Sequence, residues 1–121
     1  MAGTVIITEK RTGTVKRITW AWTTDGAGAA DGQTTHVYDG KIEALVTVPA
    51  GGANAPTDQY DITITDQDGV DVLAGAGANL AAAATQHISA TNLSAVANEK
   101  LTLNVSAAGA VKKGTVYLYI R

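Results

Sequence analysis

The chain has no cysteine and no phenylalanine, and only 5% of its 121 residues are aromatic. Without cysteine it can form no disulfide and offers no thiolate to zinc, to an iron–sulfur cluster or to nucleophilic catalysis. The formal charge of −2 lacks the basic excess that nucleic-acid binding requires. No apolar run approaches the roughly 20 residues that span a membrane, and the first residues lack the pattern of a secretory signal. We therefore expect neither a nucleic-acid nor a membrane partner.

The sequence is instead rich in small and β-branched residues, with 22 alanines and 17 threonines. Hydrophobic residues make up 45% of the chain and charged residues 17%, which is ordinary for a folded protein. The length fits one domain, and no repeat, charged run or linker divides it. We expect a single β domain over residues 1–121.

Alternation of apolar and polar residues is the dominant pattern and predicts strands. Asp39 and Gly40 form a strong signal for a two-residue hairpin turn between two of these segments. About seven or eight strands at spacings near ten residues predict an all-β fold, a sandwich or a jelly-roll-like barrel. The predicted strands are 4–10, 14–24, 34–38, 41–49, 59–65, 70–73, 100–106 and 115–120.

Two segments need a closer description. In 41–49, Ile42, Ala44, Val46 and Val48 fall on one face of the expected strand. The alanine-rich segment 74–88 has helix propensity, and Asn79 could cap a short helix over 80–84. The alternative is an ordered loop of small residues, so the sequence leaves open a helix near 79–85.

The pattern of the aromatic residues suggests a core role for the two tryptophans and an interface role for two of the tyrosines. Trp20 and Trp22 share a face with Ile18, which favours a core role in a chain without phenylalanine. The alternative is an aromatic platform for a sugar ring, as in carbohydrate-binding modules. Tyr117 and Tyr119 fall opposite the aliphatic face of the last strand and are candidate interface residues, because tyrosine buries area at low entropic cost.

An acidic cluster is the best candidate for a metal site. Asp66, Asp68 and Asp71 lie within six residues, and calcium prefers several carboxylate oxygens from a sharply turned loop. The spacing does not match an EF-hand, because Gly69 stands fourth and Gly77 occupies the position of the bidentate glutamate. A hairpin turn, with aspartates bonding nearby amides, is the favoured interpretation.

No catalytic motif is present. His36 and His87 have no second histidine or glutamate at metal-ligand spacing, and no phosphate loop, dinucleotide fingerprint or nucleophile elbow occurs. Glu43 and Glu99 could serve as an acid–base pair, but nothing in the sequence places them together. We expect neither enzymatic activity nor a cofactor.

Several segments carry a resemblance to known proteins. The start AGTVIITE, the stretch ITWAWTTDGAGAADG, the block at 55–75 with APTDQYDITITDQDGVDVLAG, and the end GTVYLYIR resemble a group of small structural proteins of tailed bacteriophages. The resemblance covers nearly the whole chain. It implies a virion structural protein, and we expect a capsid decoration (cement) protein on the outer surface of the phage head.

Such a protein would bind the major capsid protein, hold neighbouring capsomers together and self-associate, as a homotrimer. It would fold in the host cytoplasm before assembly, which fits a chain without cysteine. A tail or neck component is the alternative within the same group of proteins. The resemblance assigns a role to no single residue.

Overall fold

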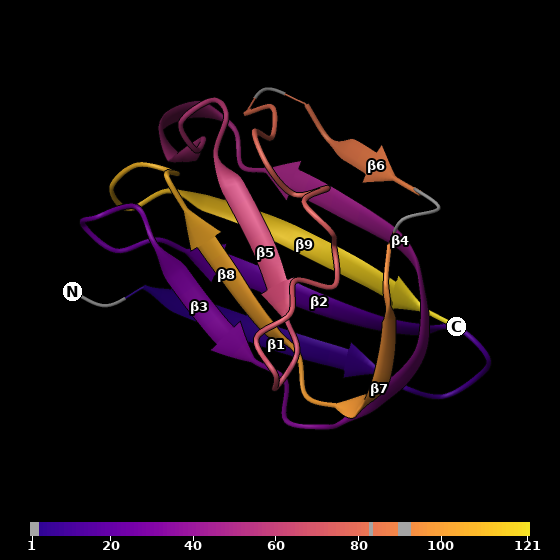
Figure 1. Cartoon of the computed structure of the whole chain (residues 1–121). Coiled ribbons are helices and arrows are strands. Elements are labelled where there is room, and N and C mark those ends of the chain that lie inside the picture. Colours follow the sequence, from indigo (N-terminus) through magenta and orange to yellow (C-terminus); the bar gives the residue numbers. More distant parts are fainter. Residues whose placement is uncertain (1–2, 83, 90–92) are drawn as a thin grey trace.

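The computed structural model describes residues 3–82, 84–89 and 93–121, and this part of the chain contains nine strands and one short 3₁₀ turn (Figure 1). Two antiparallel sheets pack face to face, which confirms the predicted all-β sandwich. The elements are β1 (Thr4–Lys10), β2 (Lys16–Thr23), β3 (Ala30–Gln33), β4 (Tyr38–Pro49), η1 (Gly52–Asn54), β5 (Asp61–Thr65), β6 (Gln86–Ile88), β7 (Ala95–Glu99), β8 (Thr102–Ser106) and β9 (Lys113–Ile120).

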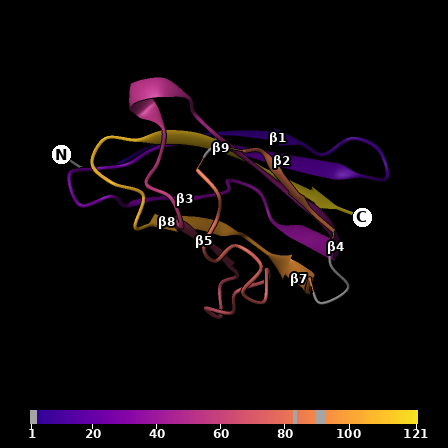
Figure 2. The same ribbon diagram turned by 90° about the horizontal axis from the view of Figure 1, so that it is seen from above.

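The two sheets differ in size. The larger has the order β1-β2-β9-β4-β6, with β7 paired to the first part of β4, and the smaller has the order β3-β8-β5. Figure 2 shows them as two layers, with β1, β2 and β9 on one side and β3, β8 and β5 on the other. The 12-residue β4 pairs with β7 near its start and with β9 along the rest of its length.

The core fills the space between the layers with alternate side chains of both sheets. Trp20 and Trp22 are 0% and 1% exposed, so the predicted core role is confirmed. Trp20 also joins the layers, because its Nε1 donates a hydrogen bond to the carbonyl oxygen of Gly32 at 3.2 Å. A sugar platform needs an exposed ring face, and neither indole offers one.

A bulge in β4 changes which residues face the core. The register shifts between Ile42 and Ala44, so Glu43 is an extra residue and the alternation moves by one position. Ala44, Val46 and Val48 share a face as predicted, but the prediction that Ile42 shares it is wrong. The core side of this strand holds Ile42, Leu45 and Thr47, whereas Ala44, Val46 and Val48 lie on the other side.

The predicted hairpin at Asp39 and Gly40 is also wrong, as is the strand at 34–38. Both residues lie inside β4, and the chain reaches it from β3 through the irregular segment 34–37. Gly40 has a φ of +125°, and a Cβ there would collide with the carbonyl of Arg121. Glycine is required by the close approach of the two chain segments rather than by a turn.

The alanine-rich segment forms a loop in the structure. Asn79 has a φ of +54°, and Leu80 forms an isolated bridge with Tyr60. Side chains take backbone donors that a helix would use, because Asp58 accepts the N–H of Ala82. Of the possible helix near 79–85, residue 83 lies outside the described residues, and the others are not helical.

Two further differences concern short segments. The predicted strand at 70–73 forms turns with one isolated bridge, between Thr65 and Asp71. The strands β6 and β7 were not predicted, since each is short and lacks a clear apolar alternation.

Candidate functional site: a contact face on the larger sheet

The larger sheet turns one side away from the core, and its register aligns the side chains there in four rows across the strands. We call this set of side chains the contact face. The first row is Thr8, Thr19, Tyr117, Val46 and His87; the second is Ile6, Ala21, Thr115 and Val48; the third is Lys10, Arg17, Tyr119 and Ala44; the fourth is Thr4, Thr23 and Lys113.

The contact face carries no carboxylate in its centre, and Glu43, exposed in the bulge beside Ala44, lies at one end of it. Its middle consists of aliphatic, threonine and tyrosine side chains, and Ile6 is 73% exposed. Four long strands at about 4.8 Å spacing, each with about seven residues at about 3.4 Å, give a flat area of about 500 Å². This area is comparable to the largest surface patch of a typical monomer, about 300–600 Å², which is often functional.

Tyr117 and Tyr119, the predicted interface residues, both lie on this face in β9. Each is partly buried between its row neighbours. The guanidinium carbon of Arg17 lies 5.3 Å from the centroid of the Tyr117 ring, a cation–π contact that fixes the orientation of both side chains. Both rings are partly exposed, and tyrosine buries contact area at low entropic cost.

The opposite side of the sandwich has a different chemistry. The outer side of β3, β8 and β5 carries polar side chains in register, and Asn104 donates a hydrogen bond to the Thr65 hydroxyl at 3.3 Å. These rows are Asp31, Asn104 and Thr63, and Gln33, Thr102 and Thr65. This polar face suits contact with water, whereas the contact face does not.

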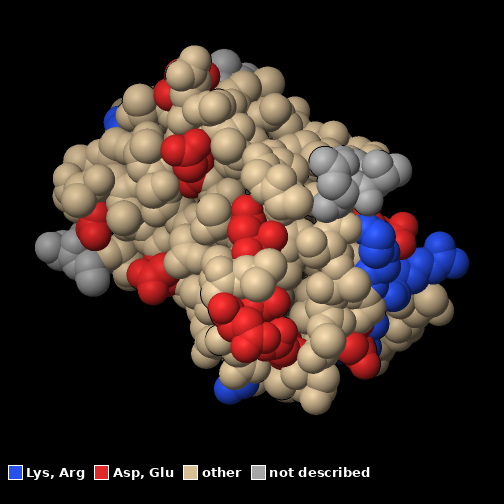
Figure 3. All heavy atoms as spheres, viewed as in Figure 1, with Lys and Arg blue, Asp and Glu red and all other residues tan. Residues whose placement is uncertain are grey.

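Charged side chains are unevenly distributed over the side of the smaller sheet. Figure 3 shows the side of the smaller sheet, on which carboxylates gather, while most of the visible Lys and Arg side chains lie at the edge near the C-terminal end. In the larger sheet, the end of β1, the start of β2 and the end of β9 bring Lys10, Arg17 and Arg121 near one another, together with their chain neighbours Arg11 and Lys16.

The predicted acidic cluster forms only in part. Carboxylate oxygens of Asp66, Asp68 and Glu99 lie within 4.8 Å of one another, so Glu99 stands where Asp71 was expected. Asp71 points elsewhere, because it accepts the backbone N–H groups of Ile64, Leu73 and Gly75.

The hydrogen bonds of this cluster are those of a turn. Asp66 Oδ1 accepts the N–H groups of Asp68 and Val70, each at 3.0 Å, as in the turn interpretation. Partial desolvation and the neighbouring carboxylates of Asp66 and Asp68 raise the pKa of Glu99. Mutual repulsion therefore acts among these groups, and turn geometry accounts for their positions.

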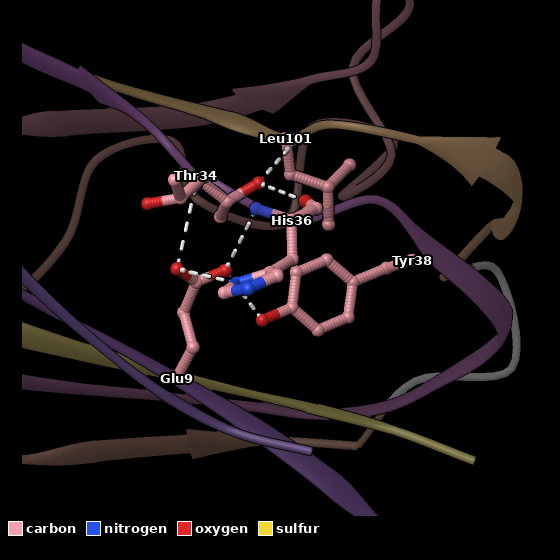
Figure 4. Close-up of polar contacts among 6 residues, drawn as sticks. Glu9, Thr34, His36, Tyr38 and Leu101 are labelled. Carbon is pink, nitrogen blue, oxygen red and sulfur yellow. Dashed lines mark hydrogen bonds and ion pairs between the residues drawn. The ribbon is translucent and has the colours of Figure 1, made fainter.

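A buried carboxylate, which the sequence did not reveal, fixes the edge of the larger sheet (Figure 4). Glu9 points inward from β1 and accepts a hydrogen bond from the Tyr38 hydroxyl at 2.6 Å. It also accepts the N–H groups of Thr35 and His36, each at 3.3 Å, and the His36 Nδ1 lies 3.3 Å away. Thr34, which begins this segment, is tied to Leu101 by hydrogen bonds in both directions.

The pKa values follow from these contacts. Burial raises the pKa of Glu9, but the hydrogen bonds it accepts from Tyr38, His36 and Thr35 outweigh burial and hold the pKa below its usual value. Burial and the adjacent Glu9 raise the pKa of Tyr38. The network therefore holds an ionised carboxylate that joins β1 to the segment leading into β4, and so supports one end of the contact face.

Comparisons of the chain with models of protein families, with curated proteins and with solved structures found no match. Within the described residues, no helix has the length and apolar character to cross a bilayer.

Proposed function

We propose that this chain is a virion structural protein that decorates the outside of a phage head and stabilises contacts between capsomers. The contact face binds the major capsid protein, and the polar outer side of β3, β8 and β5 faces the solvent. The resemblance of the sequence to small structural proteins of tailed phages supports this role. No catalysis or cofactor is part of the proposal.

The observation that carries the proposal is the contrast between the two outer sides of the sandwich. One is flat and carries aliphatic, threonine and tyrosine side chains without a carboxylate in its centre, and the other is a polar array that includes Asp31 and Asn104. The outer face of an antiparallel sheet that only contacts water is normally polar. A domain that only has to be soluble therefore needs no such difference between its two outer sides. The asymmetry is the expected form of a protein that lies flat on a larger surface.

The size of the contact face favours self-association, as a homotrimer. About 500 Å² from one copy gives about 1,000 Å² of total buried surface, which is at the lower end for a specific interface. A single copy would therefore bind weakly. In a homotrimer, binding of one copy to the shell brings the other two copies to a high effective concentration near their own sites. Three weak contacts then combine into a stable attachment.

Cosedimentation tests the proposal with phage heads assembled without this chain. Tyr117→Asp places a carboxylate in the centre of the contact face, and we expect it to weaken binding at least tenfold. Thr63→Asp adds the same charge to an exposed position of β5, on the opposite side, and should bind like the wild type. Equal binding of a folded Tyr117→Asp variant would refute the proposed face.

The location of the bound protein separates head decoration from the alternative. Immunogold labelling of complete particles should mark the head at high copy number, and loaded heads should burst at a higher temperature than bare ones. Labelling confined to the tail or neck would replace this proposal with the tail or neck role.

A further inference from the structure

A hollow at one end of the contact face gathers unpaired positive charge. It lies between the turn that connects β1 to β2 and the end of β9, has a volume of about 820 Å³ and is open to solvent. Lys10, Arg11, Arg17 and Tyr119 line it together with Glu9. Lys10, Arg17 and Tyr119 are neighbours in one row of the contact face, so the hollow is continuous with that face.

The cations of this hollow lack partners within the chain. Across the residues that the structure describes, ion pairs form between Lys16 and Asp39 and between His36 and Glu9, and none involves the three cations of the hollow. The one carboxylate in the lining, Glu9, is turned inward and accepts hydrogen bonds from Tyr38 and the backbone. The formal charge of the lining is therefore +2, from three cations and one carboxylate.

Arg17 packs against Tyr117 but leaves part of its hydrogen-bonding capacity unused within the described part of the chain. Its guanidinium lies over the ring of Tyr117, and its Nε is buried without a hydrogen-bond partner among the described residues. A guanidinium fixed by stacking loses less entropy when it binds an oxyanion, and its planar N–H groups match a carboxylate in two-point geometry.

We infer that this hollow binds an acidic segment of the partner protein, with carboxylate side chains facing Arg17, Lys10 and Arg11. The inference rests on the proposed function in one respect, that the contact face binds a protein. The volume suits several side chains rather than a single ion. The adjoining apolar surface favours a protein over a nucleic acid, which would require positive charge along the whole face.

The test uses the isolated, isotope-labelled protein and a hexaglutamate peptide, followed by NMR at low ionic strength. We expect the peptide to shift the backbone amides of Lys10, Arg11 and Arg17 in a saturable way. Salt at 0.3 M, a concentration that screens exposed charges beyond about 6 Å, should weaken binding at least tenfold. Inorganic phosphate and a hexathymidylate oligonucleotide are titrated in parallel and should bind more weakly than the peptide.

Charge reversal provides the matched variants. Lys10→Glu with Arg11→Glu changes the formal charge of the lining from +2 to −2 and should weaken peptide binding at least tenfold. Lys100→Glu with Lys112→Glu changes the net charge of the protein equally, outside both the hollow and the rows of the contact face, and should bind within about twofold of the wild type. Both sites of the first variant are exposed, so the fold should be retained.

Three results would overturn the inference: no shift in the hollow, equal loss of binding in both double variants, or tighter binding of phosphate or the oligonucleotide. The last result would indicate a phosphate site instead. Because these measurements use the isolated protein, a negative result leaves cosedimentation with heads unaffected. Failure of the hollow and failure of the contact face are therefore distinguishable.

Discussion

Replacing Glu9 with alanine should destabilise the domain by about 1–3 kcal/mol, although the residue lies on an edge strand. The side chain is 9% exposed, and its loss leaves the hydroxyl of Tyr38, a residue 2% exposed, without its acceptor. An unsatisfied buried donor costs about 1–3 kcal/mol. The N–H groups of Thr35 and His36 belong to exposed residues, so water replaces the carboxylate there at little cost.

Urea unfolding, followed by the fluorescence of the buried tryptophans, measures this effect. Glu43→Ala is the control, because Glu43 is exposed on β4, and it should change the free energy of unfolding by less than about 0.5 kcal/mol. In the Tyr38→Phe background the cost of Glu9→Ala should fall by at least about 1 kcal/mol, since no hydroxyl is left unsatisfied. A Glu9→Ala variant as stable as the control, or a cost unchanged by Tyr38→Phe, would refute the reasoning.

The same carboxylate predicts a dependence of stability on pH. The pKa of Glu9 is lower in the folded state than its ordinary value of 4.5, so folding favours the ionised form. Its contribution is therefore complete above the ordinary pKa and is lost as the pH falls through the folded-state pKa. Wild-type stability should fall more steeply than that of Glu9→Gln as the pH is lowered below about 5. Parallel pH profiles of the two proteins would contradict this.

Three further predictions concern the core and the acidic turn. Gly114→Ala places a Cβ against the ring of Trp22, and denaturation should show a loss of about 1–3 kcal/mol through overpacking. Trp20→Ala should cost about 3–5 kcal/mol in the same assay, a large share of the stability of a small domain. Glu99 has a raised pKa beside Asp66, so its ionised form opposes folding; Glu99→Gln should raise the melting temperature at pH 7 and lose this advantage in acid. An equal gain at both pH values would point to a different cause.

The all-β fold and the tryptophan core could be predicted because they depend on regular alternation and on volume. In β9 the alternation is unbroken, so the positions of Tyr117 and Tyr119 outside the core followed directly from the sequence. In β4 the extra residue Glu43 moves each later side chain to the opposite face from the one that strict alternation after Ile42 predicts. A bulge of this kind cannot be recognised from the composition of the strand. The outward Val46 and Val48, which complete the contact face, were therefore missed.

The Glu9 network was missed for a different reason. Its partners Thr35, His36 and Tyr38 lie 26 to 29 residues away along the chain, and a glutamate near the end of a strand normally faces solvent. The acidic turn was predicted in part, since Asp66 and Asp68 are local neighbours, whereas Glu99 joins them only through the fold. In both cases the contacts between residues close in sequence could be predicted from their spacing. The contacts between distant segments depend on strand pairing and could not.

The most direct test of the central claim is a density map of the virion at a resolution that orients the sandwich. The account predicts copies of this chain on the outside of the head, with the side of Tyr117 and Ile6 against the shell and the side of Thr63 and Asn104 toward solvent. Copies in the tail, or copies on the head with the polar side against the shell, would contradict it.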